Sequence, residues 1–390
     1  MRGIAPGIIA GAADLDPAAV LTATLVGATF GLAVGWVTLL CVPILQSFFH
    51  SSARIGQETG KGLVRVLRER FGRKAAFALA AMVVTVNIAM IVADLAAVSE
   101  ALSSLTRQPP YYFPAVIAFV VWAVLAMGHY KHAARALGWL SLFLFAYIGA
   151  AVVVTDSFQM LAREIFIPRI PSRPDYAIAV VAVFGSLLTP DIIIWQSSSR
   201  RDLGGAHHDS EARVGCTIAS MISLSVIICA SAMSDVNPDA LTTSQAAGAL
   251  QRFGEAGPVL FALGIVGSGL VALPILVASM CFSIAEAAGW EASLNKEPWK
   301  APGFFILISA VLLVAVTANL IGFNTVRVLY YSQVLAGIFV IPLMLYVIRL
   351  SNDVSIVSRR NTFWQNFWLG GAAGGMLVAN AAAIWLWLAR

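Results

Sequence analysis

The sequence predicts an all-α protein that crosses a lipid bilayer many times. Of its 390 residues, 59% are hydrophobic and only 12% are charged, and the mean hydropathy is +0.84. Soluble globular domains carry about 25% charged residues, so a soluble domain is excluded. The apolar residues also form long uninterrupted blocks, each sufficient for a helix that rises about 1.5 Å per residue to cross a hydrocarbon core about 30 Å thick.

We expect eleven membrane-spanning helices connected mostly by short loops. Spans 1–5 (residues 4–156) and spans 6–10 (residues 177–348) would form two repeats of one transporter domain, and span 11 would be an accessory helix. The expected spans cover residues 4–31, 34–53, 76–103, 112–128, 136–156, 177–200, 213–233, 257–285, 302–321, 327–348 and 367–388.

The basic residues predict the orientation of the chain in the membrane. If the N-terminus is cytoplasmic, eighteen of the 25 Lys and Arg residues fall on the inner side, seven of them in the loop at 54–74. This bias predicts a cytoplasmic N-terminus and an outside C-terminus, in a plasma or inner cell membrane. The net charge of +5 is thereby explained by topology, and nucleic-acid binding has no support.

Spans 1 and 6 are each interrupted by proline. Pro17 lies within span 1 and Pro190 lies at a similar depth in span 6. Proline removes a hydrogen bond of the helix and clashes with the preceding turn, so each span should divide into two half-helices. Interrupted helices at matching positions of two halves indicate an inverted-repeat transporter with its binding site near the middle of the membrane.

Four acidic residues, Asp14, Asp16, Asp94 and Asp191, lie within the expected spans, where a charged side chain is energetically unfavourable. An ionisable side chain at bilayer depth costs about 2.5–3.5 kcal/mol on insertion scales, so each requires a reason. Carboxylates, free backbone carbonyls and a hydroxyl at the two breaks would form an oxygen cage suited to a hard cation. Alternatively, the same residues simply cap two helix N-termini, a reading that does not exclude the first. The residues expected to bind substrate are Ala13, Asp14, Asp16, Thr189, Asp191 and Gln333.

Other polar residues have two readings each. Asp94, within span 3, would be an ion or proton relay or a structural partner for a neighbouring helix. Glu58 is a second relay candidate, although its place near a span end favours a solvated or salt-bridged role. Gln333 would line a cavity or join two helices by a hydrogen bond.

Several segments together resemble the NRAMP family of divalent-metal transporters, which has the LeuT-like fold. The resemblance spans most of the chain. It is carried by DPAA at 16–19, SSARIGQETGKGL at 51–63, ADLAAVSEAL at 93–102, TPDIIIWQSS at 189–198, SQV at 332–334 and RLSND at 349–353. The resemblance implies that Asp16 is the metal-binding aspartate of the first break and that Asp94 is the acidic residue of span 3.

The chain departs from the family pattern at both breaks. Ala19 and Ile192 stand where the family has asparagines, Thr189 replaces its methionine, and Asp191 replaces its histidine. A thioether favours softer ions such as Mn²⁺, whereas a hydroxyl and an added carboxylate favour a hard ion. We therefore expect selection against Mg²⁺ to be lost, as in NRAMP-related magnesium transporters. Ala97 replaces a glutamate of the family, and span 9 lacks its arginines, so proton coupling should be weak or absent.

The sequence thus predicts a transporter of Mg²⁺, Mn²⁺ or both that works by alternating access. The metal would be the substrate, no cofactor is expected, and the partners would be the small ion and the lipid bilayer. One alternative keeps the scaffold but carries a small solute such as bicarbonate or an amino acid, held by the positive N-termini of the half-helices. An enzyme is not expected, because the G-x-G-D signature of membrane aspartyl proteases is missing.

Overall fold

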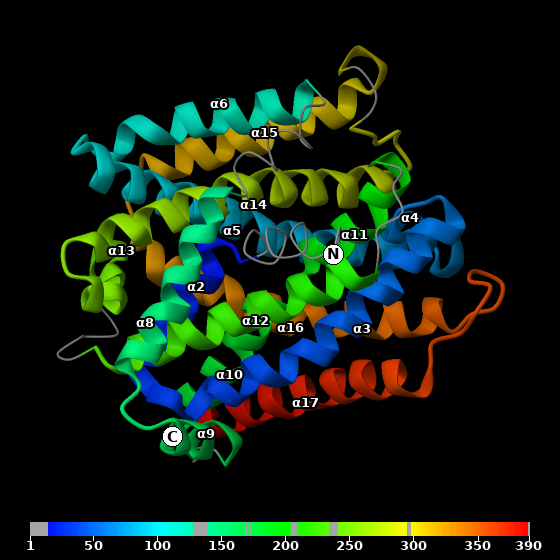
Figure 1. Ribbon diagram of the computed structural model, residues 1–390. Helices are drawn as coiled ribbons and strands as arrows, with labels where there is room; N and C mark the ends of the chain where they lie inside the picture. The colour runs from blue at the N-terminus through cyan, green and yellow to red at the C-terminus, as the bar shows by residue number, and fades with distance from the viewer. Residues whose placement is uncertain are drawn as a thin grey trace.

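The computed structural model describes residues 15–127, 139–167, 170–171, 173–203, 209–233, 241–294 and 298–388, and every regular element in these ranges is helical (Figure 1). The α-helices are α2 (Pro17–Phe30), α3 (Gly35–Thr59), α4 (Leu63–Phe71), α5 (Arg73–Thr106), α6 (Phe113–Ala126), α8 (Ala146–Val154), α9 (Phe158–Phe166), α10 (Pro174–Leu187), α11 (Pro190–Leu203), α12 (Asp209–Ser231), α13 (Thr243–Ala246), α14 (Ala256–Ala288), α15 (Pro302–Asn319), α16 (Thr325–Ser351) and α17 (Phe363–Leu388). Short 3₁₀ helices lie at Gly31–Val34, Pro110–Tyr112, Leu142–Phe145, Ala247–Phe253 and Pro298–Lys300.

The all-α membrane architecture is confirmed. Within the described residues, eight helical stretches are long and apolar enough to cross a membrane, and a ninth is obtained if Trp139–Val154 and Phe158–Phe166, bent by 112°, form one span. The helix at Pro110–Ala126 is apolar but shorter. The number of eleven spans therefore remains a prediction. The first half of span 1, with Ala13 and Asp14, lies outside the described residues.

The expected loop at 54–74 is wrong in detail, because most of it is helical. The second span continues to Thr59, and α4 follows after three residues. In α4 the apolar residues Leu63, Val64, Val66 and Leu67 are buried, while three arginines, Glu69 and Phe71 occupy the rest of the helix. Such a segment is too polar to span a membrane but buries one face against the bundle, which is why hydropathy alone marks it as a loop.

Helices α5 and α14 pack along one another at the centre of the bundle. Asn87 Nδ2 donates a hydrogen bond to the carbonyl of Leu276 at 3.2 Å, and a Cβ built on Gly269 would lie 2.2 Å from the side chain of Val98. The pairing of 87 with 276 and of 98 with 269 makes the two helices antiparallel. Small residues at such crossings allow close packing, the main source of helix association in lipid.

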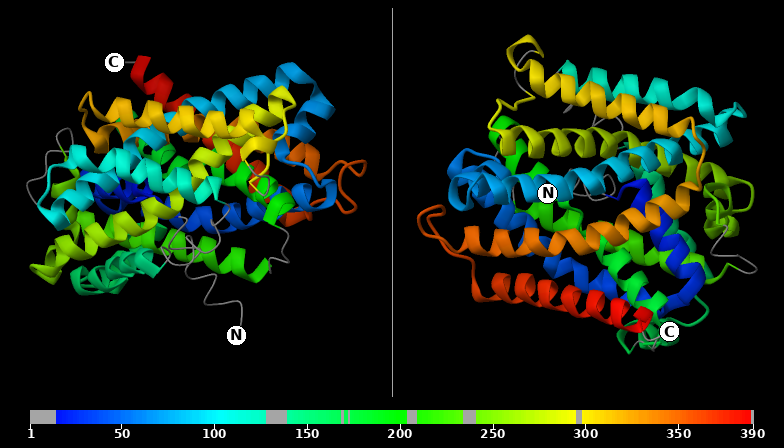
Figure 2. Two further views of the ribbon diagram at one scale, coloured as in Figure 1. Left: turned by 90° about the horizontal axis from the view of Figure 1, so that it is seen from above. Right: turned by 180° about the vertical axis from the view of Figure 1, so that it is seen from behind.

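The bundle has two ends that matter for function. We call the end that carries α4 and the C-terminal ends of α3, α14 and α16 the α4 end; it lies at the right of Figure 1. The other end, with the N-termini of α10 and α16, is called the opposite end. Helix α17 runs along the outside of the bundle beside α16, as the views of Figure 2 show.

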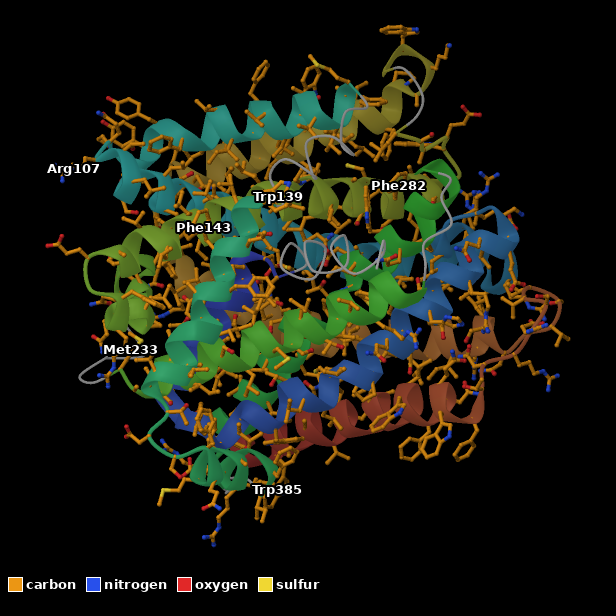
Figure 3. The ribbon with its side chains drawn as sticks, viewed as in Figure 1. Arg107, Trp139, Phe143, Met233, Phe282 and Trp385 are labelled. Atoms are coloured by element: carbon orange, nitrogen blue, oxygen red, sulfur yellow. The ribbon has the colours of Figure 1, made fainter. Side chains whose placement is uncertain are left out.

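Apolar side chains both fill the bundle and cover its outside. Phe282 is buried and packs on Phe304 with ring centroids 5.0 Å apart. Trp139 and Trp385, by contrast, are more than half exposed, and Trp385 lies at the lower edge of the bundle in Figure 3. An exterior with many exposed large apolar residues is expected of a protein whose surrounding solvent is hydrocarbon.

Candidate metal-binding site

Asp16 begins α2. Its side-chain Oδ1 accepts a hydrogen bond from the backbone nitrogen of Ala19 at 2.6 Å, and Pro17 occupies the first helical position. Proline fits there because the first N–H of a helix has no partner inside the helix. The capping interpretation of the first break is therefore correct, and it places a carboxylate, 7% exposed, at the start of a helix within the membrane.

The second break separates α10 from α11. Helix α10 ends at Leu187, Leu188 has a non-helical backbone, and α11 starts at Pro190. Asp191 lies in the first turn of α11, and the hydroxyl of Thr189 is close to its carboxylate. Neither Thr189 Oγ1 nor Asp191 Oδ1 makes a hydrogen bond of good geometry within the described residues, although both are buried.

Asp94 lies close to the acidic residues of both breaks. It lies on α5, is fully buried, and neither carboxylate oxygen has a hydrogen-bond partner in the described part of the chain. It is close enough to Asp16 and Asp191 for the three carboxylates to interact electrostatically, and the backbone amide of Ala18 is also near. Helices α2, α5 and α11 therefore bring three acidic side chains into one region of the membrane interior.

Gln333 lies on α16 at its close crossing with α10. A Cβ built on Gly185 would lie 2.1 Å from the backbone oxygen of Gln333, so the two backbones are in direct contact only because residue 185 is glycine. Gln333 is fully buried, and neither its amide nitrogen nor its amide oxygen has a hydrogen-bond partner among the described residues. Its crossing partner is the last turn of α10, which leads into the break at Thr189.

The buried polar atoms without hydrogen-bond partners at Asp94, Thr189, Asp191 and Gln333 point to an additional ligand. A buried polar group without a hydrogen bond costs about 1–3 kcal/mol, and a charged one costs more. Unpaired groups in native structures are normally satisfied by water or an ion. No group of three His, Cys, Asp or Glu side chains in the described residues is arranged to hold a metal by itself. A cation here would therefore need carboxylates together with hydroxyl, amide or carbonyl oxygens, all of which hard ions accept.

A cavity of about 190 Å³ lies at the opposite end, over the C-terminal part of α2. It is lined by residues of α2, α10 and α16, the same helices that contribute Asp16, the second break and Gln333. Its polar lining residues are Thr29, Asp175, Asn324, Arg327, Tyr330 and Tyr331. This partly polar recess lies on the side of the bundle away from α4.

The sequence analysis missed a buried carboxylate at the α4 end. Glu286, near the end of α14, is 2% exposed. Its Oε1 accepts a hydrogen bond from the hydroxyl of Ser198 at 3.1 Å, and its Oε2 accepts one from the backbone nitrogen of Arg65 at 3.2 Å. Its position at the end of a long apolar run, followed by Gly289, could have indicated a carboxylate retained for a partner.

Glu286 and Ser197 together cap α4 from other helices. Gly62, the residue before α4, makes no side-chain cap, and the Oγ of Ser197 accepts a hydrogen bond from the backbone nitrogen of Leu63 at 3.1 Å. Two of the orphan N–H groups of α4 are thus satisfied by α11 and α14. Since α11 also carries Asp191 in its first turn, this arrangement connects the site to the α4 end through one short helix.

Glu58 lies at this same end rather than beside the breaks. Its Oε2 accepts a hydrogen bond from the backbone nitrogen of Ser358, and it interacts electrostatically with Arg54. Arg54 in turn donates hydrogen bonds to the carbonyl of Ser351 at 3.0 Å and to Asn361. These contacts fit the structural interpretation of Glu58 and join α3 to the segment after α16.

Curated relatives of the chain are divalent-metal transporters. It is 27% identical over 286 residues to the divalent metal cation transporter MntH of Verminephrobacter eiseniae, covering 68% of this chain and 64% of that protein. It is 25% identical over 344 residues to MntH of Yersinia enterocolitica, covering 85% and 81% respectively. The chain thus spans less than two thirds of the Verminephrobacter protein and about four fifths of the Yersinia protein.

Solved structures share the fold at low sequence identity. A manganese transporter of Eremococcus coleocola, in complex with an aromatic bis-isothiourea compound, matches with a TM-score of 0.68 at 14% identity, over 98% of this chain and 91% of that one. MhsT in complex with L-phenylalanine matches with a TM-score of 0.63 at 15% identity, over 98% and 97%. The expected LeuT-like fold is confirmed. Residues 7–386 match the family model described as natural resistance-associated macrophage protein-like, and the chain therefore belongs to the Nramp family.

Proposed function

We propose that this chain transports divalent cations, Mg²⁺ as well as Mn²⁺, through a site at the two helix breaks. The observation that carries the proposal is the set of buried, unpartnered oxygen groups at Asp94, Thr189 and Asp191, beside Asp16. Family membership supports transport rather than catalysis. Transport needs no cofactor here, because the metal is the substrate.

The charge balance favours a cation over an anion. The N-termini of α2 and α11 both start at the site, and each contributes about +0.5 elementary charge. If a bound cation keeps all three carboxylates ionised, they contribute three negative charges, which exceed the positive charge of both helix ends. A divalent cation would bring the region close to neutrality, whereas bicarbonate would increase the excess of negative charge.

The nature of the donors supports a hard ion. Thr189 supplies an oxygen where a thioether would favour Mn²⁺ or Fe²⁺, and Asp191 adds a carboxylate to that of Asp16. Ala19 is small, which leaves room for an ion that keeps several of its waters, as Mg²⁺ commonly does. Ala13 and Asp14 remain proposed members of the site, and the backbone carbonyls of the first break would complete it.

Entry and release would use the two ends of the bundle in turn. The polar recess at the opposite end is a route of entry, and separation of α11 from α4 would open a route toward the α4 end. With the N-terminus cytoplasmic, the α4 end faces the cytoplasm. Inward movement of a cation would then be driven by the membrane potential, worth about 2.3 kcal/mol per charge per 100 mV, without coupled protons.

Uptake into proteoliposomes tests the proposal. We expect the wild type to carry both Mg²⁺ and Mn²⁺ when a potential negative inside is imposed, without acidifying the lumen. Asp16→Asn and Asp191→Asn should each reduce uptake at least tenfold. Asn caps a helix as well as Asp does, so Asp16→Asn removes the charge and keeps the helix start.

Asp156→Asn is the matched control, because Asp156 is an exposed carboxylate outside the breaks. It should transport as the wild type does. Retention of Mg²⁺ and Mn²⁺ uptake by Asp16→Asn would overturn the proposal. Uptake of labelled bicarbonate or an amino acid by a protein that carries neither cation would instead support the alternative solute.

A further inference from the structure

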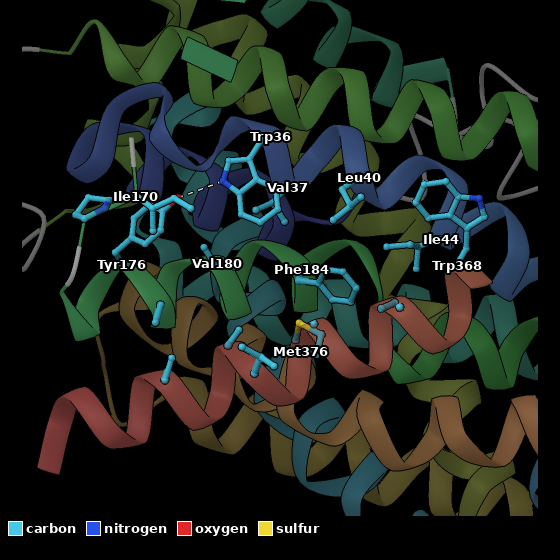
Figure 4. A pocket seen from close by; sticks show the side chains of 18 of the residues that line it. Trp36, Val37, Leu40, Ile44, Ile170, Tyr176, Val180, Phe184, Trp368 and Met376 are labelled. Carbon is cyan, nitrogen blue, oxygen red and sulfur yellow. Dashed lines mark hydrogen bonds between the residues drawn. The ribbon is translucent and has the colours of Figure 1, made fainter. Parts of the chain in front are cut away.

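A second cavity lies away from the two helix breaks, between α3, α10 and α17. It has a volume of about 720 Å³, and its walls are almost entirely apolar (Figure 4). Trp36, Leu40 and Ile44 of α3 form one wall and Val180 and Phe184 of α10 another. The third wall is α17, from Phe367 to Trp385, with small residues at Gly371 and Gly375.

This cavity opens to the membrane. Leu40 and Val378, which line it, are 38% and 69% exposed on the surface of the bundle. Gly371 and Gly375 have no atom within 4 Å of a built Cβ, so no side chain of the described residues fills the space beside them. A lipid-facing apolar cavity of this size offers water no hydrogen bonds, and hydrocarbon chains are as apolar as its walls. Its natural occupant is therefore the acyl chain of a lipid.

A cationic group lies at one end of the cavity. Arg173, just before α10, is part of the lining at the opposite end of the bundle, and its side chain is 66% exposed. Its ion pair with Asp175 is long, at 3.8 Å, and such exposed pairs contribute little, so the guanidinium can bind another anion. Arginine binds phosphate groups with two parallel hydrogen bonds.

The same end has the aromatic composition of a membrane interface. Trp36 Nε1 donates a hydrogen bond to the hydroxyl of Tyr176 at 3.1 Å (Figure 4). The Tyr176 hydroxyl donates in turn to the carbonyl of Ala33 at 2.8 Å. Tryptophan and tyrosine gather at the level of lipid headgroups, with apolar rings toward the hydrocarbon and polar atoms toward water. The headgroup level of the bilayer thus coincides with Arg173, and the apolar part of the cavity extends from there into the membrane.

We propose that this cavity is a phospholipid-binding site, in which the acyl chains lie between α3, α10 and α17 and the phosphate pairs with Arg173. The lipid would contact α10 as far as Phe184, five residues before Thr189 at the second break. A bound lipid would therefore restrain the half-helix that leads into the metal site and would fasten the accessory helix α17 to the bundle.

The glycines of α17 provide a matched test. Gly371 and Gly375 line the cavity, whereas Gly370 and Gly374 are on the same helix but not in the lining, and none of the four has an atom within 4 Å of a built Cβ. Leucine at any of them gains the same helix propensity. Only Gly371→Leu and Gly375→Leu would fill the cavity.

Native mass spectrometry of the full-length protein, purified in detergent and titrated with palmitoyl-oleoyl phosphatidylglycerol, measures the binding. We expect Gly371→Leu and Gly375→Leu to weaken lipid retention at least tenfold, while Gly370→Leu and Gly374→Leu bind as the wild type does. Equal retention by all four variants would overturn the proposal.

Arg173→Gln tests the phosphate contact without altering the packed interior, so it remains informative if a leucine variant fails to fold. It should abolish the preference for phosphatidylglycerol over palmitoyl-oleoyl glycerol, which has the same chains and no phosphate. Arg252→Gln, an exposed arginine outside the cavity, should keep that preference. An unchanged preference in Arg173→Gln would overturn the phosphate contact. A wild-type dimer that Gly375→Leu converts to a monomer would overturn the lipid site in favour of a second copy of this chain.

Discussion

Glu286 Oε2 accepts a hydrogen bond from the backbone nitrogen of Arg65 at 3.2 Å, across 221 positions of sequence. Through this contact and that with Ser198, one buried carboxylate joins α4, α11 and α14. Because α11 begins at the second break, the proposed opening toward the α4 end would separate these partners. The contact would then act both as a stabilising element and as a restraint on that movement.

Removal of this carboxylate should destabilise the closed α4 end. Glu286→Ala leaves two donors without their acceptor at a buried position, at a cost of about 2 kcal/mol or more. Glu286→Gln keeps one acceptor oxygen and should be intermediate. We expect the melting temperature in detergent to fall in the order wild type, Gln, Ala. Glu255→Ala, at the exposed start of α14, is the control and should melt as the wild type does. Equal melting of Glu286→Ala and the wild type would contradict the assigned role.

The residue at 189 should set the preference between metals. Thr189→Met introduces a thioether beside Asp191, and soft ligands favour Mn²⁺ over Mg²⁺. The ratio of Mn²⁺ to Mg²⁺ uptake should rise severalfold in Thr189→Met. Thr189→Leu adds similar bulk without sulfur, so it should reduce uptake of both ions and leave the ratio near that of the wild type. A ratio raised equally in both variants would show that size rather than sulfur is responsible.

The crossing of α10 with α16 should tolerate no side chain. In Gly185→Ala the new methyl group would meet the backbone of Gln333 at 2.1 Å and that of Gly337 at 2.6 Å, so the two helices must separate. We expect loss of thermal stability and of metal uptake. Gly149→Ala, in the interior of α8, meets its nearest atom at 3.5 Å and gains helix propensity, so it should be neutral or slightly stabilising. For both variants, a thermal-shift assay measures stability and proteoliposome uptake measures transport.

Asp353, outside the membrane after α16, should give stability a small dependence on acid pH. The Ser355 hydroxyl and backbone N–H both donate to its carboxylate, at 2.6 and 2.9 Å, and Arg70 lies 2.8 Å away; together they lower the pKa of Asp353 below 3.8. A carboxylate whose pKa is lower in the folded protein than in the unfolded chain stabilises the folded state at pH values above the unfolded-chain pKa. This contribution is lost as the pH falls through the pKa of the folded protein. Asp353→Asn should therefore melt below the wild type near pH 7, and the difference should shrink below pH 3.8. A difference that persists in acid would contradict the charge as its cause.

Local features were predictable from the sequence. The cap of α2 uses Asp16, Pro17 and Ala19, which are neighbours in the chain, and the break before Pro190 follows from the chemistry of proline itself. The helical character of most spans followed from apolar length alone. Helix α4 was missed because its stability comes from one buried face and from caps supplied by other helices.

Contacts between distant segments could not be predicted in this way. Asp94 was recognised as costly, but its place beside Asp16 and Asp191 depends on how α5 packs against α2 and α11. Glu286 was not recognised at all, since its partners are Ser198 and the backbone of Arg65. A hydrogen bond to a backbone nitrogen leaves no signature in the identity of the donor residue.

The sequence by itself determined that this protein lives in a membrane, where its helices break, and which acids lie at those breaks, because hydropathy, proline and capping act within a few residues. The tertiary structure decided which of these groups meet, how α11 is held at the α4 end, and where α17 leaves an apolar cavity beside α10. These depend on helix crossings such as that of Gly185 with Gln333, where close packing of distant segments has no local cause.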